Sequence, residues 1–483
     1  MKTKSFNWES KLVQTIELAI DVALAFLGMG TVLYFRGEID VTTIESTFDF
    51  FRDLILTNLL QLFLIVTFFR VYKTSITKNS FRKVMPRIFL ALLMTEITLV
   101  FLPFIISGFT FSKLTFFYSF FIQLIYLGIF KYIFYYIYKR VNIKNVILIG
   151  DKEGVQLLAT KLLLSNSYIK IKYLIYESDS ESDQLITIYK YIDKVEMVYM
   201  TPKLNEEKKN SIIQYCIGQN KKFFLIPKIY EIAIKNARIT QIGDVLAYEV
   251  DGLEMSFENR LAKRTLDIFI SLIGVVLTAP IMIVFAMLIY RQDKGPIFFK
   301  QERLTIHNRK FTLIKFRTMI VTAEENTGPV LASENDPRIT KFGNIMRKLR
   351  IDELPQFFNI LKGDMSIVGP RPERQFFVEQ FIKENPDYKY RMVVKAGATG
   401  LAQALGKYNT NFEDKLRFDL YYIRNYSMFQ DFLILLDTIR AIFDRKSTEG
   451  IDESSDFEEV LKFNNLFLLE SSEEPSLVRI FEK

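Results

Sequence analysis

Apolar residues dominate the first 140 positions of the chain, and shorter apolar runs separated by polar segments follow. Four apolar stretches lie at about residues 12–35, 54–72, 87–110 and 114–138. A helix needs about 20 mostly apolar residues to cross the hydrocarbon core of a bilayer, and each stretch reaches that length with its flanks. The pattern therefore predicts a domain of four transmembrane helices over residues 1–144.

The charges between these stretches predict how the helices are oriented. Lys and Arg gather before the first stretch, between the second and third, and after the fourth, whereas the loop after the first stretch carries four acidic residues. Cytoplasmic loops are enriched in Lys and Arg. We therefore expect the N-terminus, the second loop and everything after Lys144 to be cytoplasmic.

Strand-like runs alternate with helical segments over residues 145–255, which is typical of a Rossmann-like α/β domain. The runs are Asn145–Gly150, Ile171–Tyr176, Val195–Met200 and Phe223–Ile226. A dinucleotide fingerprint would need G-x-G-x-x-G after the first strand, and the loop Gly150-Asp-Lys-Glu-Gly154 lacks it. The pattern favours a scaffold used for contacts, such as dimerisation, over a dinucleotide site.

A fifth apolar run, Ile268–Tyr290, is long enough to span a bilayer but contains Pro280 near its middle. Proline removes a backbone donor and kinks a helix. Basic residues lie at both ends of the run, so a crossing would place a basic domain on the wrong side. We expect a re-entrant helix over about residues 264–291 that enters and leaves one leaflet, with a fifth span as the alternative.

Composition limits the chemistry that the chain can perform. One Cys and one His among 483 residues exclude an intrachain disulfide and multi-His or Cys-cluster metal sites, and they disfavour a Ser-His-Asp triad. The net charge is +8, and residues 448–483 carry ten acidic and three basic residues, a net of −7, which leaves +15 for the rest. A basic body beside a membrane favours anionic partners. We expect the acidic tail to be solvated and disordered, with a short helix over Phe463–Leu469 as the alternative for that part.

Two adjacent carboxylates are the first candidates for catalysis. Asp352 and Glu353 precede a helix that should end at Gly363. Asp352 could simply be the N-cap of that helix. The sharper hypothesis is that Asp352 is a nucleophile toward phosphorus, and that Glu353 helps to hold a divalent cation.

Cations flank this pair along the sequence. Lys315 and Arg317 would share one face if residues 311–319 form a strand. Arg347 lies on a helix whose apolar face is predicted to contain Phe342, Ile345, Met346 and Leu349. Arg371, between Pro370 and Pro372, would project from a fixed loop. Each of these features has an ordinary structural explanation, but together they predict a phosphate site.

These motifs together resemble a known family, the bacterial polyprenyl-phosphate phosphoglycosyl transferases of the monotopic class. The resemblance is narrower to the large form, which starts capsule or exopolysaccharide repeat units. It runs from about Asn259 to Ser447 and rests on Lys263-Arg-x-x-Asp267, Phe299–Arg303, Lys315–Met319, Asp352–Gln356, Gly363–Ser366, Gly369–Pro372 and Thr399–Gln403. The four-helix start and the Rossmann-like middle also fit the large form. Ala279 and Ala396 depart from the family, which often has Ser and Pro there.

The resemblance implies an enzyme that transfers a sugar-1-phosphate from a UDP-sugar to undecaprenyl phosphate, releases UMP and uses Mg²⁺. It implies that Asp352 forms an aspartyl phosphosugar, that Glu353 assists with the metal, and that the substrate is bound by Arg347, Arg371, Lys315, Arg317 and Gln403. The catalytic domain, residues 256–447, would be α+β and lie on the cytoplasmic face of the bacterial inner membrane. We expect the lipid bilayer and a second copy of the chain as partners, and no nucleic acid. A non-catalytic scaffold or regulator of polysaccharide synthesis or export is the alternative.

Overall fold

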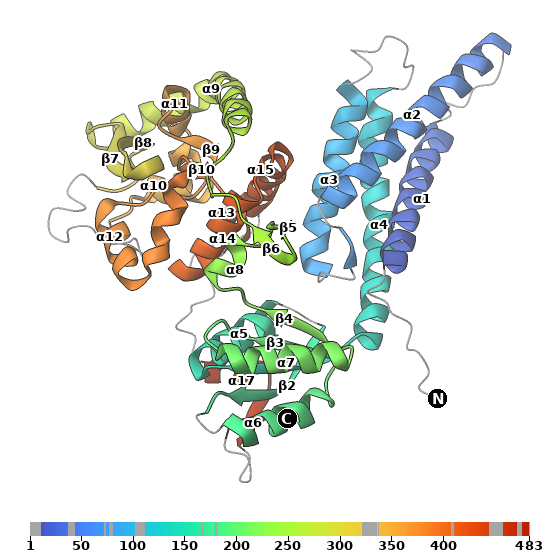
Figure 1. The fold of residues 1–483 in the computed structure, drawn as a ribbon. Helices are drawn as coiled ribbons and strands as arrows, with labels where there is room; N and C mark the ends of the chain where they lie inside the picture. Colours follow the sequence, from blue (N-terminus) through green and yellow to red (C-terminus); the bar gives the residue numbers. More distant parts are fainter. Residues whose placement is uncertain are drawn as a thin grey trace. The chain divides into compact units, whose positions relative to one another are not determined.

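The computed structural model forms two compact units, Met1–Ile226 with Ser455–Lys483 and Pro227–Ser454, and each is described by itself (Figure 1). The structure describes residues 11–36, 44–71, 74–76, 81–101, 112–165, 168–178, 181–320, 336, 338–406, 410–443, 457–470 and 476–482. Parts of two predicted segments, 102–110 of the third apolar stretch and 448–456 of the acidic tail, lie outside these ranges.

Four helices open the first unit where the apolar stretches predict them. They are α1 (Lys11–Arg36), α2 (Ile44–Val71), α3 (Phe81–Phe101) and α4 (Lys113–Val141). α1 packs against α4, and α3 packs against both α2 and α4. Within this group, α1 and residues Leu114–Val141 of α4 are long and apolar enough to cross a membrane. A crossing by α2 and α3 stays a prediction.

A buried charge cluster joins the first and fourth helices. Glu17 and Asp21 lie one turn apart on α1, and each carboxylate accepts a 2.7 Å bond from Nζ of Lys131 on α4. Glu17 also accepts a bond from the backbone N–H of Ile76, at 2.8 Å. Charges at this depth of an apolar bundle are costly unless they are paired. The pairing with Lys131 explains how α1 can carry two carboxylates on its inner face.

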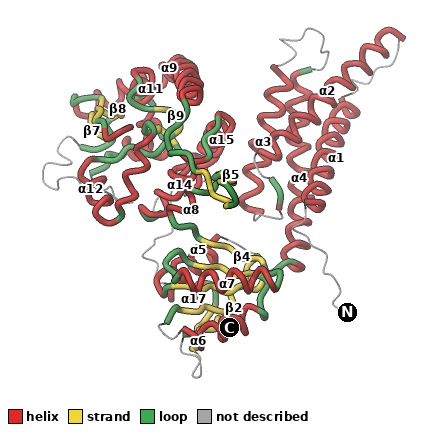
Figure 2. The backbone as a smooth tube through the Cα atoms, viewed as in Figure 1, coloured by secondary structure: helices red, strands yellow, loops and turns green. Residues whose placement is uncertain are grey.

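A six-stranded sheet forms the second part of this unit (Figure 2). Its strands lie in the order β11-β12-β2-β1-β3-β4, and β1 to β4 are parallel. β1 (Lys144–Gly150), β2 (Ile169–Tyr176), β3 (Met197–Met200) and β4 (Lys222–Leu225) confirm the predicted runs. Apolar residues on one face pack against α6 (Glu181–Ile192) and α7 (Glu206–Gly218), and those on the other face pack against α5 (Lys152–Ser165) and α17 (Phe457–Phe463).

The prediction of a disordered acidic tail is wrong for most of its length. α17 is followed by β11 (Leu466–Glu470) and β12 (Leu477–Glu482), and β12 pairs antiparallel with β2. Leu477, Val478 and Ile480 are buried, because apolar side chains of β12 complete the core of the sheet. The Rossmann-like domain therefore includes elements of the tail. It was also predicted to extend to residue 255, but residues 227–255 belong to the second unit.

In the turn after β1, the side chain of Asp151 is hydrogen-bonded to the backbone of the same turn. The Asp151 carboxylate accepts bonds from the backbone N–H of Gly154, at 3.0 Å, and from Oγ1 of Thr201, at 2.8 Å. Gly150 has φ +151°, and a Cβ there would lie 1.9 Å from the same Thr201 oxygen. In dinucleotide-binding folds a phosphate accepts the bonds at this helix N-terminus. Here a carboxylate of the chain accepts one of them.

The second unit is built around one long helix, α9 (Phe257–Asp293), and an adjoining α+β core. Before it lie α8 (Ile229–Ala233) and a hairpin of β5 (Arg238–Ile242) and β6 (Val245–Glu249). The core contains β7 (Phe298–Leu304), η3 (Ile306–Asn308), β8 (Lys310–Phe316), α10 (Lys341–Lys348), η4 (Ile351–Glu353), α11 (Gln356–Lys362), β9 (Ser366–Val368), α12 (Gln375–Glu384), η5 (Pro386–Val393), β10 (Gly397–Thr399), α13 (Leu401–Leu405), α14 (Phe412–Arg424) and α15 (Met428–Phe443).

α9 has one buried stripe and one exposed apolar face. The stripe contains Lys263, Asp267, Ser271, Met282 and Ile289, at helical spacing. On the opposite face Val276 and Leu277 are 66% and 70% exposed. The helix is continuous, and Pro280 lies inside it. α9 is long and apolar enough to cross a membrane, and its re-entrant course stays a prediction.

Candidate active site

Asp352 lies in a tight turn between two helices. α10 ends at Lys348, Arg350 takes a left-handed conformation (φ 56°), and η4 then carries Ile351, Asp352 and Glu353. α11 begins only at Gln356, with Pro355 as its N-cap residue. The reading of Asp352 as an N-cap is therefore wrong. Its side chain is 9% exposed, and the buried Oδ1 has no hydrogen-bond partner among the described residues.

Glu353 is held by cations from three segments. Its Oε1 lies 3.0 Å from Nζ of Lys315 on β8 and 3.3 Å from Nη2 of Arg371. Its Oε2 lies 3.6 Å from Nη1 of Arg350. The two adjacent carboxylates therefore differ, because Glu353 is paired at both oxygens whereas Asp352 keeps a buried oxygen without a partner.

This difference separates the acidity of the two groups. Burial, followed by the charge of Glu353, raises the pKa of Asp352 to about 6, although Lys315, Arg347 and Arg350 act to lower it. Burial would also raise the pKa of Glu353. The positive charges of Lys315, Arg371 and Arg350 outweigh that effect and hold the pKa of Glu353 well below its usual range. At neutral pH both groups are ionised, and Asp352 is the more basic.

The other predicted cations take different positions. Nε of Arg347, on α10, donates to Oγ1 of Thr318, at 2.9 Å, and its charge acts on Asp352. Arg317 follows the end of β8 and is 8% exposed. Its guanidinium lies against Gly295, where a Cβ would come within 2.5 Å of Nη1. Of the predicted strand pair, Lys315 therefore contacts Glu353, while Arg317 packs beside the end of α9.

The apolar face predicted for α10 is divided between two environments. Met346 is buried and Phe342 packs beside it, both against α9. Ile345 and Leu349 are 49% and 55% exposed. The predicted apolar face is therefore covered only in part, and these two side chains leave apolar surface next to the turn that carries Asp352.

Arg371 stands on a loop that is fixed through its carbonyl groups. Pro370 and Pro372 have no N–H, so the loop cannot use those donors. The carbonyl of Pro370 accepts from the N–H of Gly397 (2.8 Å), and that of Arg371 from Nη2 of Arg391 (2.9 Å). The carbonyl of Pro372 accepts from Nη1 of Arg303, at 3.2 Å. The loop is thereby held where the Arg371 side chain reaches Glu353.

Comparison with known proteins identifies the family that this part of the chain matches. Residues 258–445 match the family described as bacterial sugar transferase. Residues 258–445 belong to that family. We therefore refer to this segment, with its nucleophile candidate Asp352, as the sugar transferase domain.

Three relatives show how far the similarity extends. A UDP-N-acetylgalactosamine-undecaprenyl-phosphate N-acetylgalactosaminephosphotransferase of Aeromonas hydrophila is 46% identical over 183 residues, which cover 37% of this chain and 43% of the relative. The galactosyl transferase CpsE of Streptococcus agalactiae is 40% identical over 197 residues (38% and 43%). A UDP-glucose:undecaprenyl-phosphate glucose-1-phosphate transferase of Escherichia coli is 36% identical over 228 residues (46% and 49%). The matches span about half the length of these relatives or less.

Gln403 makes no hydrogen bond to Asp352 or Glu353 in the described part of the sugar transferase domain. It is on α13, and both polar atoms of its amide are buried without a hydrogen-bond partner among the described residues. A Cβ on Gly400 would lie 2.7 Å from its Oε1 and 2.2 Å from the carbonyl oxygen of Gly369. Gln403 therefore borders the loop junction behind Arg371, and no hydrogen bond connects it with Asp352 in the described part of the chain.

Three residues at the start of α9 join this helix to the sugar transferase core. Nζ of Lys263 lies 2.6 Å from Asp431 on α15. Arg264 donates to the carbonyls of Ile360 and Leu361, at 2.6 and 2.7 Å, and so caps the C-terminus of α11. Asp267 accepts from Oγ and the N–H of neighbouring residues on β9, both at 3.0 Å. The sequence offered a signal for these roles, because three charged residues stand at helical spacing before an apolar run.

The carboxylates of the sugar transferase domain offer limited ligands for a metal. No group of three or more His, Cys, Asp or Glu side chains is placed to hold a metal among the described residues. Mg²⁺ is often bound by one or two carboxylates together with substrate phosphates and water. The unpartnered Oδ1 of Asp352 fits such a site. Glu353 fits it less well, because cations already occupy both of its oxygens.

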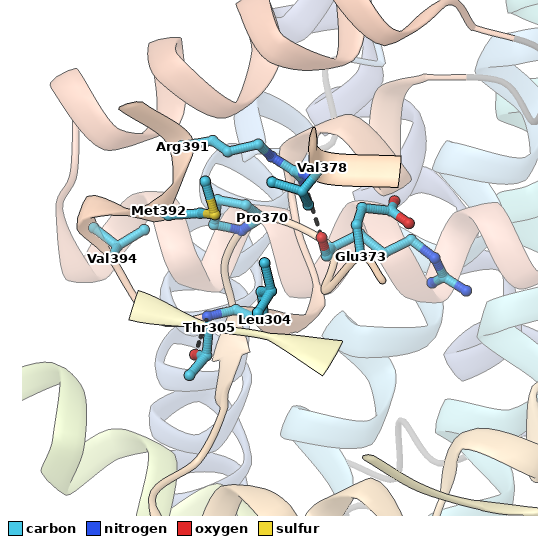
Figure 3. A pocket seen from close by; sticks show the side chains of 10 residues that line it. Leu304, Thr305, Pro370, Glu373, Val378, Arg391, Met392 and Val394 are labelled. Carbon is cyan, nitrogen blue, oxygen red and sulfur yellow. Dashed lines mark hydrogen bonds between the residues drawn. The ribbon is translucent and has the colours of Figure 1, made fainter. Parts of the chain in front are cut away.

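A small cavity lies behind the Arg371 loop (Figure 3). Its volume is about 10 Å³, close to the smallest space that holds one water molecule. The lining includes Leu304, Thr305, Pro370, Glu373 and Arg391. The cavity is too small for a nucleotide sugar, so this space is not a substrate site.

Proposed function

We propose that the chain transfers a sugar-1-phosphate from a UDP-sugar to undecaprenyl phosphate and releases UMP, as the first membrane step of capsule or exopolysaccharide repeat-unit synthesis. The observation that carries this proposal is the pair Asp352–Glu353, in which a buried carboxylate oxygen without a partner lies beside a carboxylate held by three cations. The activities of the Aeromonas hydrophila and Escherichia coli relatives support the substrate classes.

In the proposed reaction Asp352 acts as the nucleophile. Its carboxylate oxygen forms a bond to the phosphorus that bears the sugar, and the bond from that phosphorus to the bridging oxygen of UMP breaks. A phosphate oxygen of undecaprenyl phosphate then attacks the same phosphorus, which restores the Asp352 carboxylate and gives the lipid-linked diphosphosugar. The two steps balance without an oxidant or a proton donor of unusual strength.

The surrounding residues have distinct roles in this proposal. Glu353 keeps Lys315, Arg350 and Arg371 together, and these cations neutralise the diphosphate before UMP leaves. Arg347 adds positive charge next to Asp352. A bound Mg²⁺ would be held by Asp352 and, less directly, by Glu353, and it would offset phosphate charge.

The packing of α9 supports a site on one side of the membrane. The buried stripe from Lys263 to Ile289 extends over 26 residue steps, or about 39 Å of helix. If α9 crossed a bilayer, the elements packed on its second half, such as β8 and α10 at Phe316 and Met346 against Met282, would lie at hydrocarbon depth, where open strands and turns are not found. We infer that the exposed face of α9 contacts lipid from the cytoplasmic side of the bacterial inner membrane. A homodimer remains a prediction.

The experiment measures UMP release by the full chain with a panel of UDP-sugars, undecaprenyl phosphate and Mg²⁺. We expect release with at least one UDP-sugar and none above background for Asp352→Asn. Asp364→Asn is the matched control, because Asp364 is equally buried but pairs with Arg309 and Lys362. Release by Asp352→Asn at the wild-type rate would refute the nucleophile. No release with any UDP-sugar would favour the non-catalytic scaffold.

A further inference from the structure

We propose that Arg391 is a positioning residue, which sets where Arg371 stands relative to Glu353. This inference rests on the proposed function, because it assigns Arg391 a part in the same site. Arg391 is on η5, twenty residues after Arg371, and is 6% exposed. Among the described contacts Arg391 makes none with Asp352 or Glu353, and we infer that it acts through the main chain of the Arg371 loop.

The guanidinium of Arg391 makes three kinds of contact. Nη2 donates to the carbonyl oxygen of Arg371, at 2.9 Å. Nη1 donates to the hydroxyl of Tyr388, at 2.6 Å, and Nε donates to Oδ2 of Asp419 on α14, at 2.9 Å. Asp419 is 2% exposed. A buried guanidinium paired with a buried carboxylate has a fixed orientation, because its donors lie in one plane.

The Arg371 loop needs such an anchor. Its prolines remove two backbone donors, so its position depends on groups that donate to its carbonyls. Among the donors that hold the carbonyls from Pro370 to Pro372, Gly397 is a backbone group and Arg303 is a partly exposed side chain. Arg391 is the buried side-chain donor among them, and the carbonyl that it holds belongs to Arg371 itself.

The consequence for the site follows from one contact. Nη2 of Arg371 lies 3.3 Å from Oε1 of Glu353, near the outer limit for a charged hydrogen bond. A shift of the loop by about 1 Å would break this contact, and displacements of that size cost roughly 100-fold in rate at many active sites. The bond from Arg391 prevents this shift, so we assign it a role in turnover as well as in folding.

The test is a double-mutant cycle with the full chain in nanodiscs, measured as kcat/KM for UMP release. Arg391→Lys keeps a positive charge next to Asp419 but lacks the planar fork. We expect kcat/KM to fall roughly 10- to 100-fold. In an Arg371→Lys background the same substitution should cost less than about threefold, because the group that it positions is already impaired.

Arg417→Lys is the matched control. Arg417 lies on α14, the helix of Asp419, and also contacts two carboxylates (Asp414 and Glu413) and one main-chain carbonyl, that of Pro227. We expect it to change kcat/KM less than threefold in either background. Tyr388→Phe removes a single bond to Arg391 and serves as the second variant if Arg391→Lys folds poorly. We expect a several-fold loss that likewise disappears in the Arg371→Lys background.

Two results would overturn the assignment. One is an equal loss from Arg391→Lys in both backgrounds, which would mean a general effect on folding. The other is wild-type kcat/KM for Arg391→Lys and Tyr388→Phe. Failure of the proposed function itself is distinguishable, because it would show as activity of Asp352→Asn or as no UMP release by the wild-type chain.

Discussion

Replacing Asp352 with Asn should stabilise the second unit (Pro227–Ser454) and abolish the proposed reaction. Asp352 is 9% exposed, and burial beside Glu353 raises its pKa from 3.8 to about 6. Because the folded-state pKa is raised, the stabilising contribution of this group is complete below the unfolded pKa and is lost as pH rises through about 6. At pH 7 the ionised carboxylate therefore costs stability, and a neutral amide of the same shape avoids that cost.

The magnitude follows from the size of the shift. A rise of the pKa from 3.8 to about 6 corresponds to about 3 kcal/mol at pH 7, and the same linkage leaves roughly half of that at pH 5. For a unit of this size, 3 kcal/mol corresponds to roughly 6–12 °C in Tm. We expect Asp352→Asn to raise the Tm at pH 7 by up to that amount, and by about half as much at pH 5.

The assay is thermal unfolding of the full chain in nanodiscs at several pH values, with the sensitivity of the second unit (Pro227–Ser454) to trypsin as a second probe. Asp364→Asn is the control of opposite sign, because it weakens the contacts to Arg309 and Lys362. It should leave the Tm unchanged or lower it. A lower Tm for Asp352→Asn, or a gain that does not depend on pH, would contradict the assignment of a strained, like-charged carboxylate.

Two further predictions concern catalysis and the tail. The rate of UMP release should rise about tenfold between pH 5 and pH 7 as Asp352 ionises. Glu353→Gln should move this rise to lower pH, because it removes a negative charge beside Asp352. An unchanged pH profile in Glu353→Gln would contradict an effect of the Glu353 charge on the pKa of Asp352. Leu477→Asp should destabilise the first unit (Met1–Ile226 with Ser455–Lys483) by several kcal/mol, because Leu477 is fully buried in the sheet. Phe463→Asp should have little effect in the same thermal unfolding measurement, because Phe463 is 83% exposed. Similar Tm values for the two variants would contradict the packing of β12 in the sheet.

Local patterns predicted the parts of this fold that depend on neighbouring residues. The parallel strands and the helix that ends at Gly363 (φ 95°) agree with the alternation and the cap signal in the sequence. The nearness of Lys315 and Arg371 to Glu353 also agreed, because several cations gather around one carboxylate pair. The strands and the helix end are encoded within short windows, whereas Lys315 and Arg371 lie 38 and 18 positions from Glu353 and were expected near it from the resemblance.

Long-range pairings were not predictable in the same way. Lys131 is 114 positions from Glu17, and its charge looked like an ordinary interruption of an apolar helix. The strand Leu477–Glu482 was hidden in a segment whose acidic composition resembles that of disordered tails, although its own residues are strand formers. Arg391 gave no local signal for its role, since Arg371 and Asp419 lie 20 and 28 positions away.

The apolar periodicity of α10 shows a different limit of local patterns. Periodicity identifies apolar faces but does not say what covers them. In a soluble domain Ile345 and Leu349 would have to be buried, yet here they are exposed next to Asp352, on a unit whose α9 has its own exposed apolar face. At a membrane surface both faces are compatible with the fold, so the pattern does not distinguish a core contact from a lipid contact.

Charge counting connects the site to its proposed substrate. Lys315, Arg347, Arg350 and Arg371 bring four positive charges to two carboxylates, which leaves the cluster with a net charge of +2. The diphosphate group of a UDP-sugar brings about two negative charges, so its binding would neutralise the excess positive charge of the cluster. It would also place phosphate charge next to Asp352, which raises the pKa of a carboxylate. The more fully the diphosphate is neutralised, the more of Asp352 stays ionised for attack, and this is the physical reason why the proposal includes both the loop that fixes Arg371 and a divalent cation.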